Sequence, residues 1–371
     1  MPIKVLHVMG MDSLKYGGIE RFMITLQNAT PDIEHILVYD SLPKSEDYLR
    51  HLHSRILEMP IQGIHTFISI PRFISILRQE HPDYVHFHFE SAFAIYSYIA
   101  HFMGIKVIYK TAHSCLYVNG KQAVDIKDLS CKYQIVTLGK YAYRYINKTL
   151  AVSNFVRDQL IGVYGKHIKV ETMYLGSSPC SQTVVNTRIT RSSINIKDSD
   201  IVVGTTLFAS HIKGCDILYR AIALVKKSNI KFLVLGLNPK SEFTNYLNNL
   251  AIELGIANRI ISMGIIDNVP EYLRLMDIFV QPSRTEALSL SCVEAASAGL
   301  PIIGSNVGGL PEVSSITFPV EDHVRLAELI DELASNEEYR LLLGSQSFKR
   351  FSDFFSIGNT INKYKTLYQC R

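Results

Sequence analysis

The sequence predicts an α/β protein of two doubly wound parallel-sheet domains, Rossmann-like in architecture, that face a cleft. Three observations predict this class. Short apolar runs typical of buried strands alternate with amphipathic segments in two long series. A polar stretch without a strong period, residues 174–198, separates the two series. The length of 371 residues is long for one domain and comfortable for two.

The first series begins with the apolar run at 3–8, which predicts a buried strand. A helix follows at 19–28, because Ile19, Phe22, Met23 and Leu26 recur at helical spacing. The same reasoning predicts the rest of the series, with strands at 35–40, 84–89, 106–110 and 148–153 and helices at 67–80, 91–104 and 153–163.

The second series starts after the polar stretch. Residues 215–228 form an amphipathic helix, with Ile217, Leu218, Ala221, Ile222 and Val225 on one face. A shorter helix is expected at 289–298, where small side chains allow close packing on a sheet. Strands are expected at 200–208, 231–236, 259–264, 277–283 and 301–306.

Composition narrows the class of protein. A hydrophobic fraction of 47% and a charged fraction of 19% describe a folded globular chain with a large core, and exclude a disordered one. The six cysteines lie far apart without a C-x-x-C pair, so reduced thiols in a cytosol are expected. No signal peptide is expected at the N-terminus. The apolar stretch 92–109 is interrupted by His101, Gly104 and Lys106, which favours a buried helix and strand over a membrane span.

Ligands of doubly wound sheets bind at the carboxyl ends of the strands, so the loops that follow the strands are the candidate sites. Gly17 and Gly18 precede the helix at 19–28 and could let an anion approach the helix N-terminus. A tight turn explains them equally well, and their spacing differs from G-x-G-x-x-G. Lys213 follows the strand at 200–208 and suits a phosphate, although it could be an ordinary surface lysine.

Two carboxylates, Glu286 and Glu294, flank the start of the helix at 289–298. Free N–H groups at a helix start can bind a phosphate, and carboxylates on either side can accept hydrogen bonds from hydroxyls. A sugar–diphosphate–ribose ligand has this order of parts. The alternatives are that Glu286 favours the helix dipole and that Glu294 is a surface charge.

The stretch PSRTEALSLSCVEAASAGLPIIGSNVGGLPEV resembles the nucleotide-sugar signature of the retaining glycosyltransferases of family 4, which have the GT-B fold. The pattern comprises E-x7-E, here Glu286 and Glu294, then G-x-P at 299–301 and G-G-x-P-E at 308–312. The opening KVLHVMG…YGGIERF, the segment TAHS (111–114) and the segment LAVSNFVRDQL (150–160) are also similar to the family. The resemblance covers nearly the whole chain.

The resemblance implies catalytic roles for Glu286, His113 and Lys213. Glu286 would hold hydroxyls of the transferred sugar, His113 would reach the sugar or acceptor, and Lys213 would neutralise the diphosphate. Gly17 and Gly18 would cap the diphosphate from the other domain. The remaining donor-binding residues would be Met263 and Gly264 at the base, Glu294 at the ribose, and the backbone of Ala287, Leu288, Ser289 and Leu290 at the sugar and diphosphate.

The resemblance also implies a division of labour. Residues 1–175 would form the acceptor-side domain, with a C-terminal helix at about 355–371 packing back on it. Residues 176–198 would be the linker, and 199–354 the nucleotide-sugar-binding domain. The donor is expected to be UDP-linked, with no cofactor and no metal. His86 and His88 share one face of a strand, but no third metal ligand can be named from the sequence.

One position departs from the family pattern: Phe208 stands where an arginine usually accompanies the lysine, so Ser210 or His211 would have to compensate. A catalytically silent subunit supporting a partner enzyme therefore stays open, as does a nucleotide-sugar epimerase.

The charge distribution bears on the acceptor. Residues 101–170 carry 11 Lys and Arg against 3 Asp and Glu, whereas the whole chain has a net charge of only +4. This predicts either a solvated face or an anionic partner, namely a membrane surface or a phosphate-bearing substrate; nucleic acid is disfavoured because no binding motif accompanies the charge. We expect a lipid-linked glycan acceptor in bacterial surface polysaccharide (capsule-type) biosynthesis, and a cytoplasmic protein peripheral to the inner face of the plasma membrane.

Overall fold

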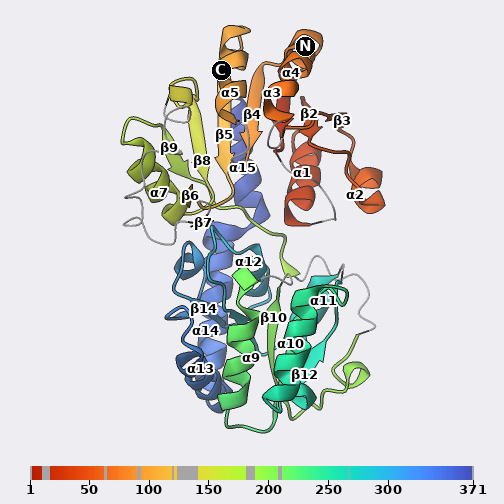
Figure 1. The fold of residues 1–371 in the computed structure, drawn as a ribbon, viewed down its shortest axis with the longest axis vertical. Helices are drawn as coiled ribbons and strands as arrows, with labels where there is room; N and C mark the ends of the chain where they lie inside the picture. The colour runs from red at the N-terminus through yellow and green to blue at the C-terminus, as the bar shows by residue number, and fades with distance from the viewer. Residues whose placement is uncertain are drawn as a thin grey trace. The chain divides into compact units, whose positions relative to one another are not determined.

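The computed structural model describes residues 2–10, 17–61, 65–89, 93–118, 121–122, 141–180, 189–207, 211–266 and 268–369. The chain divides into two compact units (Figure 1). Unit 1 comprises Met1–Leu175 and Ile357–Arg371, and unit 2 comprises Gly176–Ser356. Each unit is built on a parallel sheet with helices around it, which confirms the predicted fold class.

The sheet of unit 1 has seven strands in the order β3-β2-β1-β4-β5-β8-β9, all of them paired in parallel. Its strands are β1 (Ile3–Val8), β2 (Ile33–Tyr39), β3 (Arg55–Glu58), β4 (Tyr84–His88), β5 (Val107–Ala112), β8 (Lys148–Ala151) and β9 (Val170–Thr172). A small antiparallel pair, β6 (Tyr117–Val118) with β7 (Lys121–Gln122), follows β5. The helices are α1 (Gly18–Ala29), α2 (Glu46–His51), α3 (His65–Ile68), α4 (Ile70–Glu80), α5 (Phe93–Phe102), α7 (Asn154–Tyr164) and α15 (Ile357–Gln369).

Strand alternation gives the two faces of this sheet different characters. Val8 and Phe87 lie on one face, where Phe87 packs on Phe73 of α4 with ring centroids 6.4 Å apart. The opposite face carries histidines, among them His7 of β1 and His86 of β4, which are register partners. Helix α15 covers this polar face. The rings of two of its tyrosines, Tyr364 and Tyr368, pack on the His86 ring with centroids 5.7 and 5.9 Å apart.

The sheet of unit 2 has six strands in the order β12-β11-β10-β13-β14-β15, again all parallel. Its strands are β10 (Ile201–Thr206), β11 (Ile230–Leu235), β12 (Ile260–Ser262), β13 (Ile278–Gln281), β14 (Ile302–Ser305) and β15 (Ile316–Phe318). The helices are α9 (Cys215–Leu224), α10 (Glu242–Glu253), α11 (Val269–Leu273), α12 (Leu290–Ser297), α13 (His323–Ser335) and α14 (Glu337–Arg350). Helices α9 and α13 contribute apolar side chains to one core with β10, β11 and β13.

Several short elements were not predicted, including the edge strands β3, β9 and β15, of four, three and three residues. The helix predicted at 215–228 ends early, because Val225 already has extended backbone. Most of the polar segment 174–198 belongs to unit 2 and part of it contacts the rest of that unit. Within it, Arg191 pairs with Asp277 at 2.9 Å and donates to the Leu275 carbonyl at 3.1 Å.

Candidate active site

The order of strands in unit 2 reverses between β10 and β13, which are neighbours in the sheet. The loops leaving these two strands run in opposite directions, and this is where doubly wound sheets bind ligands. Lys213 lies after β10 and Glu286 after β13, and the structure brings them together: Lys213 Nζ is 2.5 Å from Glu286 Oε1. The Glu286 side chain is 9% exposed and that of Lys213 26%, so the pair is only partly open to solvent.

A hydrogen-bond chain from β13 orients the Glu286 carboxylate. Gln281 donates from Nε2 to Ser283 Oγ at 2.8 Å, and Ser283 Oγ donates to Glu286 Oε1 at 3.1 Å. The same carboxylate oxygen therefore accepts from Ser283 and from Lys213. The side chains of Gln281, Ser283 and Glu286 are all buried, so the carboxylate has little freedom to rotate.

The second glycine turn of the signature supports the backbone of Glu286. Gly309 donates its N–H to the Glu286 carbonyl at 3.1 Å. Gly308 has φ +54°, and a Cβ at this position would collide with the same carbonyl oxygen. The turn therefore needs glycine because it lies directly against the peptide that carries Glu286.

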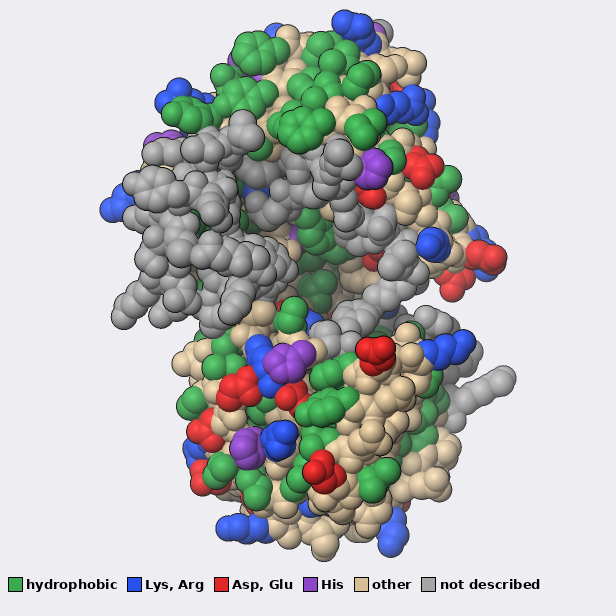
Figure 2. All heavy atoms as spheres, in the orientation of Figure 1, with side chains coloured by type: hydrophobic (Ala, Val, Ile, Leu, Met, Phe, Trp, Pro, Cys, Tyr) green, Lys and Arg blue, Asp and Glu red, His purple; other side chains and the backbone are tan. Residues whose placement is uncertain are grey.

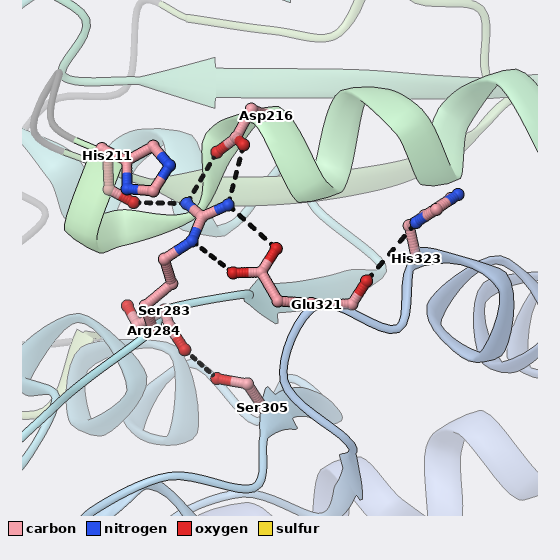
Figure 3. A network of polar contacts seen from close by, with 7 residues as sticks. All are labelled: His211, Asp216, Ser283, Arg284, Ser305, Glu321 and His323. Carbon is pink, nitrogen blue, oxygen red and sulfur yellow. Dashed lines mark hydrogen bonds and ion pairs between the residues drawn. The ribbon is translucent and has the colours of Figure 1, made fainter. Parts of the chain in front are cut away.

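Arg284 fixes the loop after β13 against the start of α9 (Figure 3). Its Nη1 and Nη2 donate to the two carboxylate oxygens of Asp216 at 2.9 and 2.8 Å, and its Nε donates to Glu321 at 2.5 Å. Burial by itself would raise the pKa of Asp216, but the hydrogen bonds and charge of Arg284 outweigh it and lower that pKa. The bidentate geometry makes this a strong pair.

The same arginine holds the short turn that carries Lys213. Arg284 Nη1 donates to the His211 carbonyl at 2.5 Å, and the Arg284 N–H donates to the Ile212 carbonyl at 2.8 Å. The loops of Lys213 and Glu286 are thus joined by one guanidinium. This role could not be predicted from the sequence: Arg284 lies inside the signature, but nothing in its spacing points to Asp216, 68 residues earlier.

The helix after Glu286 forms as predicted, as α12 (Leu290–Ser297). Ser289 is its N-cap and accepts from the Cys292 N–H at 3.3 Å. Ala287 and Ser289 are buried and Leu288 and Leu290 half-buried, so the backbone predicted to bind the donor lies at the start of this helix. Glu294 lies in its second turn and is half-buried; its negative charge, after burial, helps to raise the pKa of the Cys180 thiol.

Met263 and Gly264 lie just after β12, at the same carboxyl edge of the sheet. Met263 donates its N–H to the Val234 carbonyl at 3.1 Å, and the Gly264 carbonyl accepts from the Gly236 N–H at 2.6 Å. Phe208, where the family pattern is broken, and Ser210, which could compensate, both lie outside the described residues.

Unit 1 places its predicted site residues after β1 and β5. Gly17 is the N-cap of α1, and its N–H donates to Glu20 Oε2 at 3.0 Å; Gly18 begins the helix. His113 follows β5 and is half-buried, with its ring stacked on Phe89 at 4.5 Å. Desolvation, and then the charge of Lys110, lower the pKa of His113 to about 3, so its ring is neutral near pH 7. That the two sets of residues share one ligand stays a prediction.

The structure supplies the third histidine that the sequence could not name. His7, His86 and His88 are buried, and one ring nitrogen of each lies within 4.8 Å of the other two. Every ring nitrogen of the three has a hydrogen-bond partner, from another histidine or from Tyr368 or Thr111. A metal ion would have to replace some of these bonds, so we assign the group a hydrogen-bonding role; metal independence stays a prediction.

Comparisons with known proteins identify the class. A family model described as Glycosyltransferase Family 4 matches residues 16–177, and one described as Glycosyl transferases group 1 matches 199–336. The sequence of this chain is 27% identical to that of an uncharacterized glycosyltransferase of Methanocaldococcus jannaschii, over 97% of both chains. They are 24% identical to N-acetyl-alpha-D-glucosaminyl L-malate synthase of Bacillus anthracis, over 79% of this chain and 76% of that protein.

Solved structures show the same fold. Anabaena HepE in complex with UDP superposes with a TM-score of 0.81 at 17% identity, covering 98% of this chain and 99% of that one. WaaG, a glycosyltransferase involved in lipopolysaccharide biosynthesis, has a TM-score of 0.69 at 15% identity over 99% and 100%.

The two parallel-sheet units and the solved structures show the GT-B fold, and the family matches identify a glycosyltransferase. The chain belongs to the family 4 glycosyltransferases, because the two family models together match most of its length. Among the helices of the described segments, none combines the length and the hydropathy that a bilayer crossing requires.

Proposed function

We propose that this glycosyltransferase is a retaining enzyme that moves a sugar from a UDP-linked donor to a hydroxyl of a lipid-linked glycan in surface polysaccharide biosynthesis. The observation that carries the proposal is the Lys213–Glu286 pair, 2.5 Å apart where the strand order of unit 2 reverses. Support for the donor comes from the structural neighbour HepE, solved with UDP and with UDP and glucose. Support for the pathway comes from the Escherichia coli O-antigen biosynthesis glycosyltransferase WclY, 26% identical over 48% of this chain.

In this proposal each candidate site residue of unit 2 acts on one part of the donor. Lys213 and the N-terminus of α12 stabilise the negative charge that develops on the diphosphate as it leaves. Glu286 accepts hydrogen bonds from hydroxyls of the transferred sugar, and Glu294 from the ribose. Met263 and Gly264 contact the base. Because Lys213 contacts Glu286 in this structure, a bound diphosphate would share the ammonium with that carboxylate.

Bond changes in the transfer balance without a cofactor. The bond between the anomeric carbon and the diphosphate oxygen breaks, and the acceptor oxygen bonds to the same face of that carbon, so the configuration is retained. The proton of the acceptor hydroxyl passes to the departing phosphate oxygen. Unit 1 supplies Gly17 and Gly18 for the diphosphate, and the neutral His113 ring as a hydrogen-bonding group for the sugar or acceptor.

The test is nucleoside diphosphate release from UDP-, GDP- and ADP-linked sugars by the purified chain. We expect slow release of UDP without acceptor, and a loss of about 100-fold or more in Glu286→Gln, which keeps the shape of the side chain but removes the charge. Glu338→Gln, at an exposed position of α14 in the same unit, is the matched control and should not change the rate. Unchanged release in Glu286→Gln would contradict the proposed role. Conversion of the donor sugar to its epimer without acceptor would instead identify an epimerase.

The surface of unit 1 supports the membrane part of the proposal. Phe102 at the end of α5 is 76% exposed and Tyr141 is 50% exposed, while Lys106 and Arg144 beside them in the sequence are also exposed. Arg144 lies over the Tyr141 ring at 5.2 Å. Figure 2 shows hydrophobic side chains together with Lys and Arg side chains at the top of the view, at the end of unit 1 where α5 lies. Exposed aromatic and basic side chains are the combination that binds an anionic bilayer surface.

Sedimentation with vesicles containing anionic lipid tests this surface. We expect retention at low salt that weakens as salt rises, and that falls in the double variant Phe102→Ser/Arg144→Ser. Lys226→Ser, an exposed lysine of unit 2, controls for the loss of one charge. Failure of the vesicles to retain the unmodified protein would refute the membrane contact and leave the transferase proposal untouched.

A further inference from the structure

Four histidines of unit 1 form one continuous hydrogen-bonded chain, which we call the imidazole chain. It begins at Thr30, at the C-terminal end of α1, where Thr30 Oγ1 is 2.8 Å from His35 Nε2. His35 Nδ1 is 2.9 Å from His7 Nε2, and His7 Nδ1 is 3.1 Å from His88 Nε2. His88 Nδ1 is 3.2 Å from Nε2 of His113, which ends the chain.

The direction of every hydrogen bond in the imidazole chain follows from its first member. Thr30 Oγ1 also lies 2.6 Å from the Leu26 carbonyl oxygen, and a carbonyl can only accept. The single hydroxyl proton of Thr30 is therefore donated to Leu26. It follows that His35 must donate its Nε2–H to Thr30, since two lone pairs facing each other at 2.8 Å would repel.

The assignment then propagates ring by ring. A neutral imidazole has one donor and one acceptor nitrogen. With Nε2 protonated, His35 accepts at Nδ1 from His7 Nε2–H, and His7 accepts at Nδ1 from His88 Nε2–H. His88 accepts at Nδ1 from His113 Nε2–H. The rings are neutral because burial lowers the pKa of His35 to about 4 and that of His113 to about 3, and places those of His7 and His88 well below 6.5.

Thr30, at the far end of the imidazole chain from His113, cannot accept or release a proton. Thr30 is buried, and its own proton is held by a backbone carbonyl, which is not a base near pH 7. A proton arriving at His113 therefore has no sink at Thr30, and the chain does not conduct. What it does is impose one tautomer on His113, with Nε2 protonated and Nδ1 unprotonated. Among the described residues, no group hydrogen-bonds to Nδ1 of His113.

We propose that Thr30, His35, His7 and His88 are positioning residues that hold His113 as the Nε2–H tautomer, so that its Nδ1 accepts a hydrogen bond from a hydroxyl of the bound sugar or acceptor. The catalytic meaning of this inference rests on the proposed function, whereas the tautomer itself does not. The imidazole chain spans three neighbouring strands, β2, β1 and β4, and the segment after β5. The tautomer of His113 therefore depends on the hydroxyl of Thr30, 83 positions earlier in the sequence.

The test uses the full chain labelled with ¹⁵N in its histidines. Correlation of the ring nitrogens with the ring carbon protons distinguishes a protonated from an unprotonated nitrogen, and His113→Gln identifies the signal of His113. We expect His113 in the Nε2–H form at pH 7.5. Thr30→Val keeps the side-chain shape but removes the acceptor for His35, so the reversed order, which ends in Nδ1–H at His113, should gain population. Thr30→Ser restores the hydroxyl and should restore the Nε2–H form.

Kinetics with the donor give the second readout. We expect kcat for UDP release to fall about tenfold in Thr30→Val, the order of one lost hydrogen bond, with partial or full recovery in Thr30→Ser. A His113 signal in the Nδ1–H form in the unmodified protein, or one unchanged by Thr30→Val, would overturn the inference. If the protein released no nucleotide but showed the expected tautomers, the proposed function would fail while the imidazole chain stood.

Discussion

Acidification should destabilise unit 1 selectively, because its sheet buries histidines that cannot take up protons while folded. His35 and His86 are at most 4% exposed, and burial lowers their pKa values to about 4 and about 3 from 6.5. Between pH 6.5 and pH 4 the unfolded chain binds protons at these two positions that the folded unit does not. The free energy of unfolding therefore falls as the pH falls, and it is highest above pH 6.5.

The magnitude follows from the pKa values. A pH of 5 lies about 1.5 pH units below the pKa of an unfolded histidine. Each of these pH units changes the free energy of unfolding by about 1.4 kcal/mol per histidine. His35 and His86 should each remove about 2 kcal/mol from the free energy of unfolding of unit 1 between pH 7.5 and pH 5, so about 4 kcal/mol together. The lowered pKa values of His7 and His88 act in the same direction. Such a loss is a large fraction of the stability of a typical domain.

The assay must report each unit separately, because a two-unit chain need not unfold in one step. Buried cysteines provide the probes: Cys115 lies in unit 1 and Cys292 in unit 2, and both are free thiols. Urea titrations at pH 7.5 and pH 5, with pulse labelling by a disulfide reagent that reacts in acid and peptide mass spectrometry, give an unfolding curve for each.

His35→Gln removes one of the titrating rings and should shrink the pH-dependent loss at Cys115 by about 2 kcal/mol, whatever it does to stability at pH 7.5. His81→Asn, at an exposed left-handed position of the same unit, is the control and should leave the loss unchanged. Equal unfolding free energies of unit 1 at the two pH values, or a full loss retained in His35→Gln, would refute the reasoning.

Three further predictions concern unit 2. Lys213→Met should weaken UDP binding in calorimetry by about 10- to 100-fold, because a charge-assisted contact to the diphosphate is lost. Lys226→Met, at an exposed position, is the control and should not weaken it. Equal affinities of the two variants would exclude Lys213 from the site. Gly308→Ala should lower the free energy of unfolding by about 3 kcal/mol or more in urea titration, because the new Cβ meets the Glu286 carbonyl. Gly299 has φ +74° and open space around it, so Gly299→Ala should cost only about 1–2 kcal/mol. Similar losses in the two glycine variants would contradict the close contact. Arg284→Lys cannot bind both oxygens of Asp216, so it should cost about 1–3 kcal/mol near pH 7. It should also make the free energy of unfolding of unit 2 less sensitive to pH below 4, because the pKa of Asp216 returns toward its usual value and the folded and unfolded chains then bind protons at this group alike. Unchanged acid sensitivity would argue against that pair.

The sequence predicted which residues of the candidate site follow strand ends and therefore lie at one edge of the sheet. Lys213 and Glu286 each come just after an apolar run, and parallel strands place those ends on one edge. What it could not predict is which strands are neighbours, because apolar alternation does not encode strand order. The proximity of His7 and His88 depends on β1 lying beside β4, and the pairing of Arg284 with Asp216 depends on β10 lying beside β13. The edge strands were missed because three or four residues carry too little pattern.

Helix α15 belongs to unit 1, although it follows unit 2 in the sequence. Helix α15 is separated in sequence from the rest of unit 1 by all of unit 2, yet its Tyr368 hydroxyl lies 2.6 Å from His86 Nδ1 and its Tyr364 hydroxyl 3.0 Å from Thr111 Oγ1. During synthesis, the polar sheet face of unit 1 therefore stays uncovered until α15 has left the ribosome. A fragment that stops at residue 175 would keep every strand of the first sheet but lack this cover, and should require the α15 peptide, added in trans, to become soluble and protease-resistant.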